Sequence, residues 1–196
     1  MSMLDGVSQC WVLSKGCVVN WDAWAAVGTV AAVFTAVFAP TIQRLLVRKR
    51  TNALFALAYR TDLFAALDMV KQLRAKYPFG NGSIEAFQAE ASLVTDEHFR
   101  DELTRHANIL NVLTVREVDL TKWQGVDVSL AATVALAIET TKNLHKAYVN
   151  LAVAGRVGRA ADHFHVAEYV GNLAESHLAD ANHAVKRAIR PIAKEG

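Results

Sequence analysis

The sequence predicts an all-α protein, with one N-terminal transmembrane helix followed by an antiparallel cytoplasmic helical bundle of about four long helices. Residues 21–43 contain a single formal charge, Asp22, although 20% of the whole chain is charged. Four cations follow within residues 44–50. Beyond residue 50, apolar residues recur every three or four positions, and the alternation typical of strands is missing. Together these observations favour a membrane anchor joined to a helical domain.

The predicted transmembrane helix covers residues 21–43. These 23 residues would form a helix of about 34 Å, which is long enough for a hydrocarbon core of roughly 30 Å. Trp21 and Trp24 lie one turn apart at its start, where indole rings favour the membrane interface. Pro40 cannot donate a hydrogen bond to the carbonyl of Ala36, so we expect a bend near the end of the span.

A basic juxtamembrane segment, residues 44–50, sets the expected orientation. Its cations are Arg44, Arg48, Lys49 and Arg50. Because the cytoplasmic flanks of membrane helices carry an excess of Lys and Arg, residues 1–20 are predicted to be a short extracytoplasmic segment and residues 51–196 a cytoplasmic helical bundle. The same cations suit anionic lipid headgroups, so we expect a bilayer with anionic headgroups as a partner.

Two alternatives exist for the apolar stretch. A helix at the centre of a soluble bundle is also apolar on every side, although it has no reason to end in a block of four cations. A cleaved signal peptide has a basic N-terminal region and a shorter apolar core, whereas Lys15 is the only cation before residue 21 here.

Small residues recur along one face of the predicted span, at Ala25, Gly28, Ala32 and Ala36. This spacing lets two helix backbones approach closely, and it therefore predicts helix association and a homo-oligomer. Small residues are also simply common in membrane helices, which is the alternative explanation. The middle of the span contains no ionisable residue to mark an ion path, so we interpret it as an anchor.

The extracytoplasmic segment carries both cysteines of the chain, Cys10 and Cys17. In an oxidising compartment they could pair, or each could be a small apolar residue near the membrane. Since residues 51–196 contain no cysteine, a cysteine nucleophile and thiolate metal ligands are excluded there.

The cytoplasmic part is predicted to begin with an amphipathic helix that continues from the span and stops at PFGNG, residues 78–82. Its apolar positions are Leu54, Leu57, Ala58, Phe64, Leu67, Val70 and Leu73. Ser83 is the expected cap of a short helix, and Thr95 of the next, which has Asp96 and Glu97 in its first turn and continues to about Leu120.

Two long helices complete the prediction. One runs from about Ser129 to Gly155, a glycine suited to a helix C-terminus, and the other from about Gly158 to Arg190, before Pro191. Their expected buried positions are Leu130, Val134, Ala137, Ile138, Leu144, Tyr148 and Leu151 in the first, and Ala161, Phe164, Ala167, Gly171, Ala174, Leu178, Ala181 and Val185 in the second.

Charge argues against a nucleic-acid partner. Residues 51–196 contain 16 Lys or Arg and 17 Asp or Glu, which leaves a net charge of −1 with neutral histidines. A nucleic-acid-binding domain needs a basic footprint, and this part of the chain has none overall. We therefore expect no nucleic acid among the partners.

A set of histidines offers a different hypothesis, a metal-binding bundle. His98, Glu102 and His106 are spaced four residues apart on one helix face, although the two histidines would be about 12 Å apart along the axis, too far to share an ion. On the last helix, Asp162, His165, His177, Asp180 and His183 lie opposite the apolar face and are interpreted as solvated surface.

Other chemical motifs are missing from the sequence. GRVGR, residues 155–159, lacks the Gly-Lys-Ser or Gly-Lys-Thr ending of a phosphate-binding loop, and neither a dinucleotide fingerprint nor a Gly-x-Ser-x-Gly elbow occurs. We therefore assign no catalytic, cofactor-binding or metal-binding residues and expect no cofactor.

The arrangement NWDAWAAVGTVAAVFTAVFAPTIQRLLVRKR, followed by helices, resembles small single-pass membrane proteins of bacteria and their prophages. These proteins open with a Trp-flanked span that has Ala-Pro near its end and a basic exit. The resemblance covers about residues 20–50 and implies a bacterial inner membrane, but it transfers no site residues.

Two functional hypotheses follow. The first is a membrane-anchored interaction or regulatory module with an unknown cytoplasmic protein partner, which includes a self-associating defence or toxin-type effector. The second is a membrane-anchored enzyme or metal-binding helical bundle that uses His98, Glu102 and His106.

Overall fold

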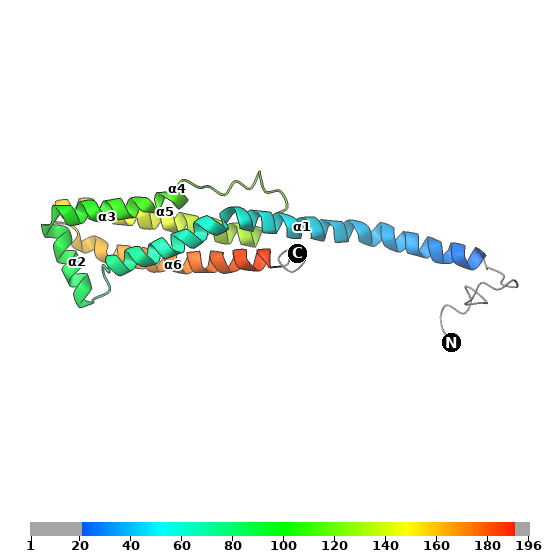
Figure 1. Cartoon of the computed structure of the whole chain (residues 1–196), viewed down its shortest axis with the longest axis horizontal. Coiled ribbons are helices and arrows are strands. Elements are labelled where there is room, and N and C mark those ends of the chain that lie inside the picture. Colours follow the sequence, from blue (N-terminus) through cyan, green and yellow to red (C-terminus); the bar gives the residue numbers. More distant parts are fainter. Residues whose placement is uncertain (1–20, 191–196) are drawn as a thin grey trace. The chain divides into compact units, whose positions relative to one another are not determined.

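The computed structural model describes residues 21–190, apart from the side chains of residues 21–23, 112 and 114 (Figure 1). Of these residues 84% are helical, and no strand occurs among them, which confirms the all-α prediction. The predictions for residues 1–20, including Cys10 and Cys17, and for Pro191 lie outside the described residues.

The described chain folds into helices of very different lengths. They are α1 (Trp21–Lys76), α2 (Ile84–Thr95), α3 (Glu97–Ile109), α4 (Asn111–Thr114), α5 (Val128–Arg156) and α6 (Ala161–Ile189). The described residues divide into two compact units, and the boundary falls within α1, between Val47 and Arg48.

Helix α1 confirms that an amphipathic helix continues from the apolar stretch, because Trp21–Lys76 is one helix of 56 residues. It runs through Pro40 without ending. The predicted break after it is also confirmed. Gly80 and Gly82 have φ angles of 76° and 72° in this connection, a backbone conformation that glycine adopts without strain.

The buried face of α1 in the second unit differs from the predicted one. Leu54, Leu57 and Phe64 are 58%, 47% and 52% exposed, and Ala58 is exposed too, whereas Val70 and Leu73 are buried as expected. The other buried positions are Ala53, Phe55, Ala56, Tyr59, Leu63 and Ala66. Residues 53–67 are apolar around most of the helix, so periodicity fits two faces and the neighbouring helices decide between them.

The core of the second unit lies among α1, α3, α5 and α6. Helices α5 and α6 share the most extensive contact, and α3 packs on α5 (Figure 1). Helix α1 reaches α6 through Asn182, whose Nδ2 donates to the carbonyl of Leu63 at 3.2 Å. All seven predicted core positions of α5 are buried, as are those of α6 except Ala161, which is exposed in the first turn.

The helix caps are partly as predicted. Ser83 caps α2, since its side chain accepts from the backbone N of Ala86 at 3.1 Å. Thr95 does not cap α3. It is the last residue of α2, and Asp96 is the cap instead, accepting from the backbone N of His98 at 2.8 Å. A carboxylate at this position is also favoured by the helix dipole.

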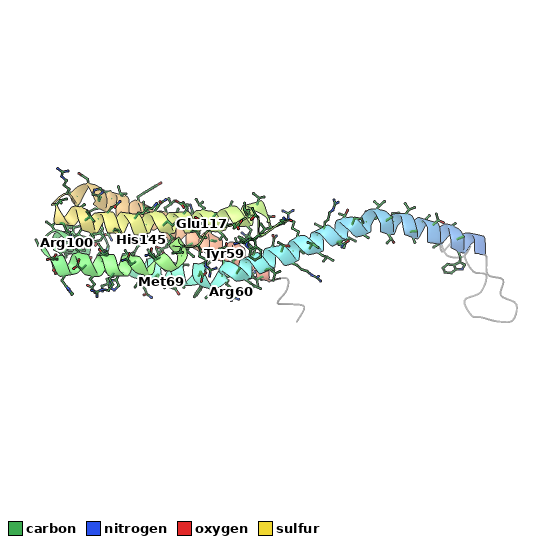
Figure 2. The ribbon with its side chains drawn as sticks, turned by 90° about the horizontal axis from the view of Figure 1, so that it is seen from above. Tyr59, Arg60, Met69, Arg100, Glu117 and His145 are labelled. Carbon is green, nitrogen blue, oxygen red and sulfur yellow. The ribbon has the colours of Figure 1, made fainter. Side chains whose placement is uncertain are left out.

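The helix expected to reach Leu120 stops earlier, at Ile109, and is followed only by the single turn α4. Tertiary contacts explain the difference. The hydroxyl of Tyr59 donates to the backbone carbonyl of Glu117 at 3.1 Å (Figure 2), and Trp123 meets the ring of Phe55 edge-on at 5.4 Å. These contacts with α1 compete with further helical hydrogen bonds.

Gly155 does not end α5, which continues to Arg156. Its role is close packing, because a Cβ at this position would lie 2.8 Å from the backbone oxygen of Leu93. The residue with the backbone typical of a helix end is Gly158, with a φ of 67°.

Candidate functional site

The most unusual feature of the described chain is the apolar part of α1. Residues 24–43 contain no charged side chain, and every one of them is exposed. Within the described residues, one helix is long and apolar enough to span a membrane, and none of its most apolar window is buried. A core helix of a soluble protein would be mostly buried, so the structure does not place this segment in a core.

The hydroxyl groups of this segment are satisfied within the helix. Oγ1 of Thr29 donates to the carbonyl of Ala25, and Oγ1 of Thr35 to that of Ala31, each at 2.8 Å. In hydrocarbon an unpaired hydroxyl is costly, and a bond to the preceding turn removes that cost. The rings of Phe34 and Phe38 stack with centroids 5.8 Å apart.

The flanking residues are placed as follows. Trp24 is exposed, and Trp21 begins α1, although its side chain is outside the described residues. The exposed cations are Arg44, Arg48, Lys49 and Arg50. Arg48 forms an ion pair with Asp127, whose pKa is lowered first by the hydrogen bond from the backbone N of Ser129 and also by Arg48.

The four small residues predicted for helix association, Ala25, Gly28, Ala32 and Ala36, are all exposed. A Cβ at Gly28 would meet nothing within 4 Å. Larger side chains on this face are therefore free of clashes within the chain, which makes them suitable probes of association. The association itself remains a prediction.

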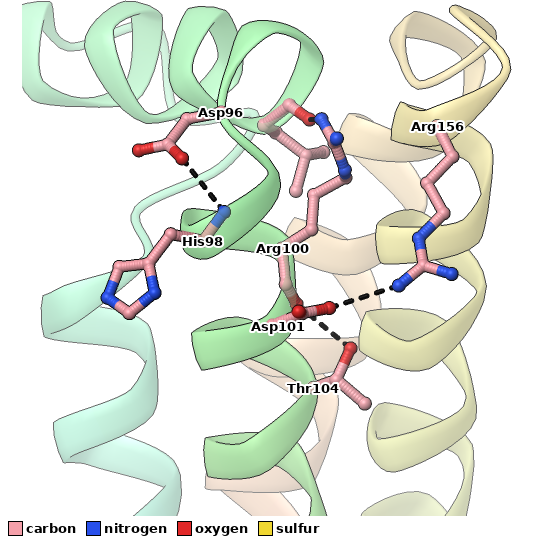
Figure 3. A network of polar contacts seen from close by, with 7 residues as sticks. Asp96, His98, Arg100, Asp101, Thr104 and Arg156 are labelled. Atoms are coloured by element: carbon pink, nitrogen blue, oxygen red, sulfur yellow. Dashed lines mark hydrogen bonds and ion pairs between the residues drawn. The ribbon is translucent and has the colours of Figure 1, made fainter.

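The predicted histidine face is occupied by contacts with α1 and the residue after it. Nζ of Lys76 donates to Glu102 at 2.8 Å, and Nδ1 of His106 shares a hydrogen bond with the hydroxyl of Tyr77 at 2.7 Å. His98 is exposed and contributes its backbone N to the Asp96 cap (Figure 3). Among the described residues, no group of three metal-ligating side chains is close enough to hold an ion.

Tyr77 and His106 line a small cavity of about 250 Å³ together with Met69, Gln72 and Ile109. Burial, and secondly the charge of Glu102, raise the pKa of Tyr77 to about 12. The phenol of Tyr77 is therefore protonated at neutral pH.

A groove of about 460 Å³ between α5 and α6 was missed by the sequence analysis. Its charged and imidazole groups are His177, Asp180, His183 and Arg187 of α6. Three of the residues interpreted as solvated surface thus share a groove, and Nδ1 of His177 is buried without a hydrogen-bond partner. In the sequence, the three- and four-residue spacing of these side chains indicates that they share one helix face. The groove itself exists only because α5 lies beside that face.

The end of the unit that holds α2 is fixed by arginines. Arg100 donates to the backbone carbonyls of Leu93 and Val94 at 3.0 and 3.1 Å. Arg156 of α5 forms an ion pair with Asp101 of α3 at 3.0 Å (Figure 3). Arg100 and Arg156 thus make structural contacts between helices.

Helix α2 also presents an apolar face that no other described element covers. Ile84, Phe87, Ala91 and Val94 are exposed and follow the spacing of one helix face. Such contiguous apolar surface is uncommon on monomeric soluble domains and is often functional.

Comparisons with protein-family models, curated proteins and solved structures found no match.

Proposed function

We propose that this protein is a single-pass membrane protein whose helical part acts as an interaction or regulatory module at the membrane surface. The observation that carries the proposal is the exposed, uncharged apolar part of α1, residues 24–43. The helical part is taken to be an antiparallel bundle whose long elements are α1 beyond residue 47, α3 with α4, α5 and α6.

The free energy of burying apolar side chains supports the membrane anchor. Eight large apolar side chains between Trp24 and Ile42 are each about half exposed. Burying such a side chain fully contributes about 1.5–3 kcal/mol, so half of that for eight residues is about 6–12 kcal/mol. The whole stability of a typical domain is about 5–15 kcal/mol. A lipid environment for this segment removes a cost of comparable size.

The proposed orientation places residues 1–20 outside and residues 51–196 in the cytoplasm of a bacterium, with the span in the inner membrane. Arg44, Arg48, Lys49 and Arg50 support it through the positive-inside bias. The same cations would contact anionic headgroups, each contributing about 1 kcal/mol near the surface.

Topology and extraction test the anchor. A fluorescent protein that folds only in the cytoplasm should be active when fused after Gly196, and a periplasm-dependent phosphatase should be inactive there. The untagged protein should stay in the membrane pellet after alkaline carbonate treatment. Recovery of the full chain in the high-speed supernatant without detergent would contradict the proposal.

Self-association is proposed through the face of Ala25, Gly28, Ala32 and Ala36. Substituting Ala32→Leu should lower the oligomer mass in detergent, because the larger side chain separates the two backbones. Ala26→Leu is the matched control, since it makes the same change on another face of the helix. Equal oligomer mass for both variants would remove this face from the proposal.

An interaction role is supported by the exposed apolar face of α2, formed by Ile84, Phe87, Ala91 and Val94. The proposed partner is a cytoplasmic protein. A defence or toxin-type effector is a special case, in which induction of the protein should depolarise the cell membrane. An unchanged membrane potential on induction would contradict that case.

The alternative, an anchored enzyme or metal-binding bundle, has weaker support because Lys76 and Tyr77 already engage Glu102 and His106. Metal analysis of the purified protein tests it. Stoichiometric metal that is lost in both His98→Ala and His106→Ala would favour the alternative.

A further inference from the structure

The helical part of the chain is electrically polarised, although its net charge is close to zero. We define the basic end as residues 48–55, 119–131 and 183–190. These three segments contain seven Lys or Arg and two Asp or Glu, a net charge of +5. We define the acidic end as residues 76–102 and 153–168, which contain four Lys or Arg and eight Asp or Glu, a net charge of −4.

Contacts show that the three segments of the basic end lie together. Oδ1 of Asn52 accepts from the backbone N of Asp127 at 2.7 Å, and the rings of Phe55 and Trp123 meet at 5.4 Å. Thr133 of α5 and Arg187 of α6 line the same groove, so the start of α5 lies beside the last turns of α6. Likewise Arg156 and Asp101 are bonded at the acidic end.

The cations of the basic end are largely free. Its two carboxylates, Asp119 and Asp127, are engaged by Lys122 and Arg48. Five cations of this end are exposed and have no ion pair in the described part of the chain, namely Lys49, Arg50, Lys186, Arg187 and Arg190. Lys186 lies over the ring of Phe64.

Exposed apolar side chains accompany these cations. Val128 is 77% exposed and Leu120 is 54% exposed, and both flank the turn that precedes α5. Leu54 of α1, also within the basic end, is exposed too. A surface that combines cations with protruding apolar residues fits a bilayer interface, where headgroups meet the cations and the apolar side chains reach the acyl boundary.

We propose that the basic end of the helical part docks on an anionic bilayer surface, so that the domain is held against the membrane and does not rotate freely below its anchor. The proposal rests on the single-pass anchor proposed above, since Arg48 follows the apolar segment directly in the chain. It adds a second contact, made by Arg187, Arg190 and Lys122, whose side chain stays 78% exposed beside Asp119. The repulsion of the acidic end from the same lipids reinforces the orientation.

Interaction with the helix dipole of α6 explains only part of the basic end. Lys186 and Arg187 lie in the last turn of α6, where cations interact favourably with the helix dipole. That explanation does not extend to Lys49 and Arg50 in the interior of α1, or to the exposed Val128. Attraction to anionic headgroups accounts for the cations, and contact with the acyl boundary accounts for the exposed Val128.

Amide hydrogen exchange of the full chain in lipid nanodiscs tests the docking. In nanodiscs with phosphatidylglycerol, amides of residues 119–127 should exchange more slowly, by roughly an order of magnitude, than in nanodiscs of phosphatidylcholine alone. Raising the salt concentration should remove the difference, because screening weakens contacts between exposed charges. Equal exchange in the two lipids would overturn the proposal.

Two matched triple variants test whether the lipid-dependent protection comes from the basic end. The triple variant Lys122→Glu, Arg187→Glu and Arg190→Glu should lose the lipid-dependent protection. A control with Lys71→Glu, Arg105→Glu and Arg159→Glu changes the net charge equally at exposed cations outside the basic end and should keep it. Loss of protection in both triples would contradict a specific surface.

Two further measurements separate this proposal from folding defects and from the anchor. Replacing the same three cations by Gln removes the charge with less disturbance of α6, and thermal unfolding followed by circular dichroism shows whether each variant folds. Carbonate extraction reports the anchor alone. Retention in the pellet without lipid-dependent protection would reject the docking and leave the anchor in place.

Discussion

The two parts of α1 have the same backbone structure and opposite surroundings. Residues 24–47 are exposed at every position and almost entirely apolar up to Gln43, whereas residues 48–76 have one buried apolar face and an exposed remainder that contains charged residues. In the second part, the side chains facing solvent include Arg60, Asp68 and Lys71. In the first part no such polar face exists. A continuous helix therefore says little about its solvent, and the chemistry of the exposed side chains identifies it.

The largest expected effect comes from placing charge in the first part. The double variant Val30→Arg and Val33→Arg should lose membrane retention, since each Arg costs about 2.5–3.5 kcal/mol at the centre of a span. Leu57→Arg with Ala58→Arg, at exposed positions of the second part, should leave retention unchanged. Carbonate extraction measures both, and full retention of the first variant would remove the contrast between the two parts.

The second-largest effect is expected on stability, from truncating a buried leucine in residues 48–76 of α1. Leu63→Ala should lower the free energy of unfolding by about 2–5 kcal/mol, because Leu63 is fully buried and its truncation leaves a cavity. Leu57→Ala makes the same change at an exposed position, and its cost should be well below that of Leu63→Ala. Chemical denaturation of the solubilised protein gives both values, and similar costs would mean that the buried face of α1 is wrongly assigned.

A smaller loss of stability is expected from removing the arginine that joins α1 to α6. Arg74 donates to Glu175 and to Oδ1 of Asn172, and it packs against Gly171, where a Cβ would lie 3.1 Å from its Cδ. Arg74→Met should cost about 1–3 kcal/mol of unfolding free energy, since Glu175 loses its partner. Arg156→Met breaks an ion pair whose side chains are more than half exposed, and it should cost at most about 1 kcal/mol.

The smallest effect appears only at high pH. Because burial raises the pKa of Tyr77 to about 12, an unfolded tyrosine ionises from about pH 10 while the folded one stays neutral. The stability that Tyr77 contributes is therefore complete below pH 10 and is lost as the pH rises toward 12. In Tyr77→Phe, stability should fall less steeply over this range. An unchanged slope in denaturation experiments would contradict the raised pKa.

Local signals of the sequence located most helices correctly. Ser83 was identifiable as a cap because its hydroxyl suits the free backbone N–H groups of a helix start, and the glycines of residues 78–82 mark the break after α1. The exposed apolar segment was identifiable from its length and lack of charge. Each of these features depends only on residues that are close together in the sequence.

Other features depend on residues far apart in the chain. Leu54 and Phe55 are both apolar, and only the second is buried, where its ring meets that of Trp123. The end of α3 at Ile109 depends on contacts such as that of Tyr59 with Glu117. The groove at His177 exists because α5 lies alongside α6.

The sequence by itself determined that the chain is helical and that one segment suits lipid, because hydrogen bonding within a helix and the transfer of apolar side chains are local and add along the chain. Only the tertiary structure decided which faces are buried and where charge gathers. The net charge of −1 beyond residue 50 conceals a basic end and an acidic end, since a sum over the sequence discards position, whereas electrostatic attraction depends on distance.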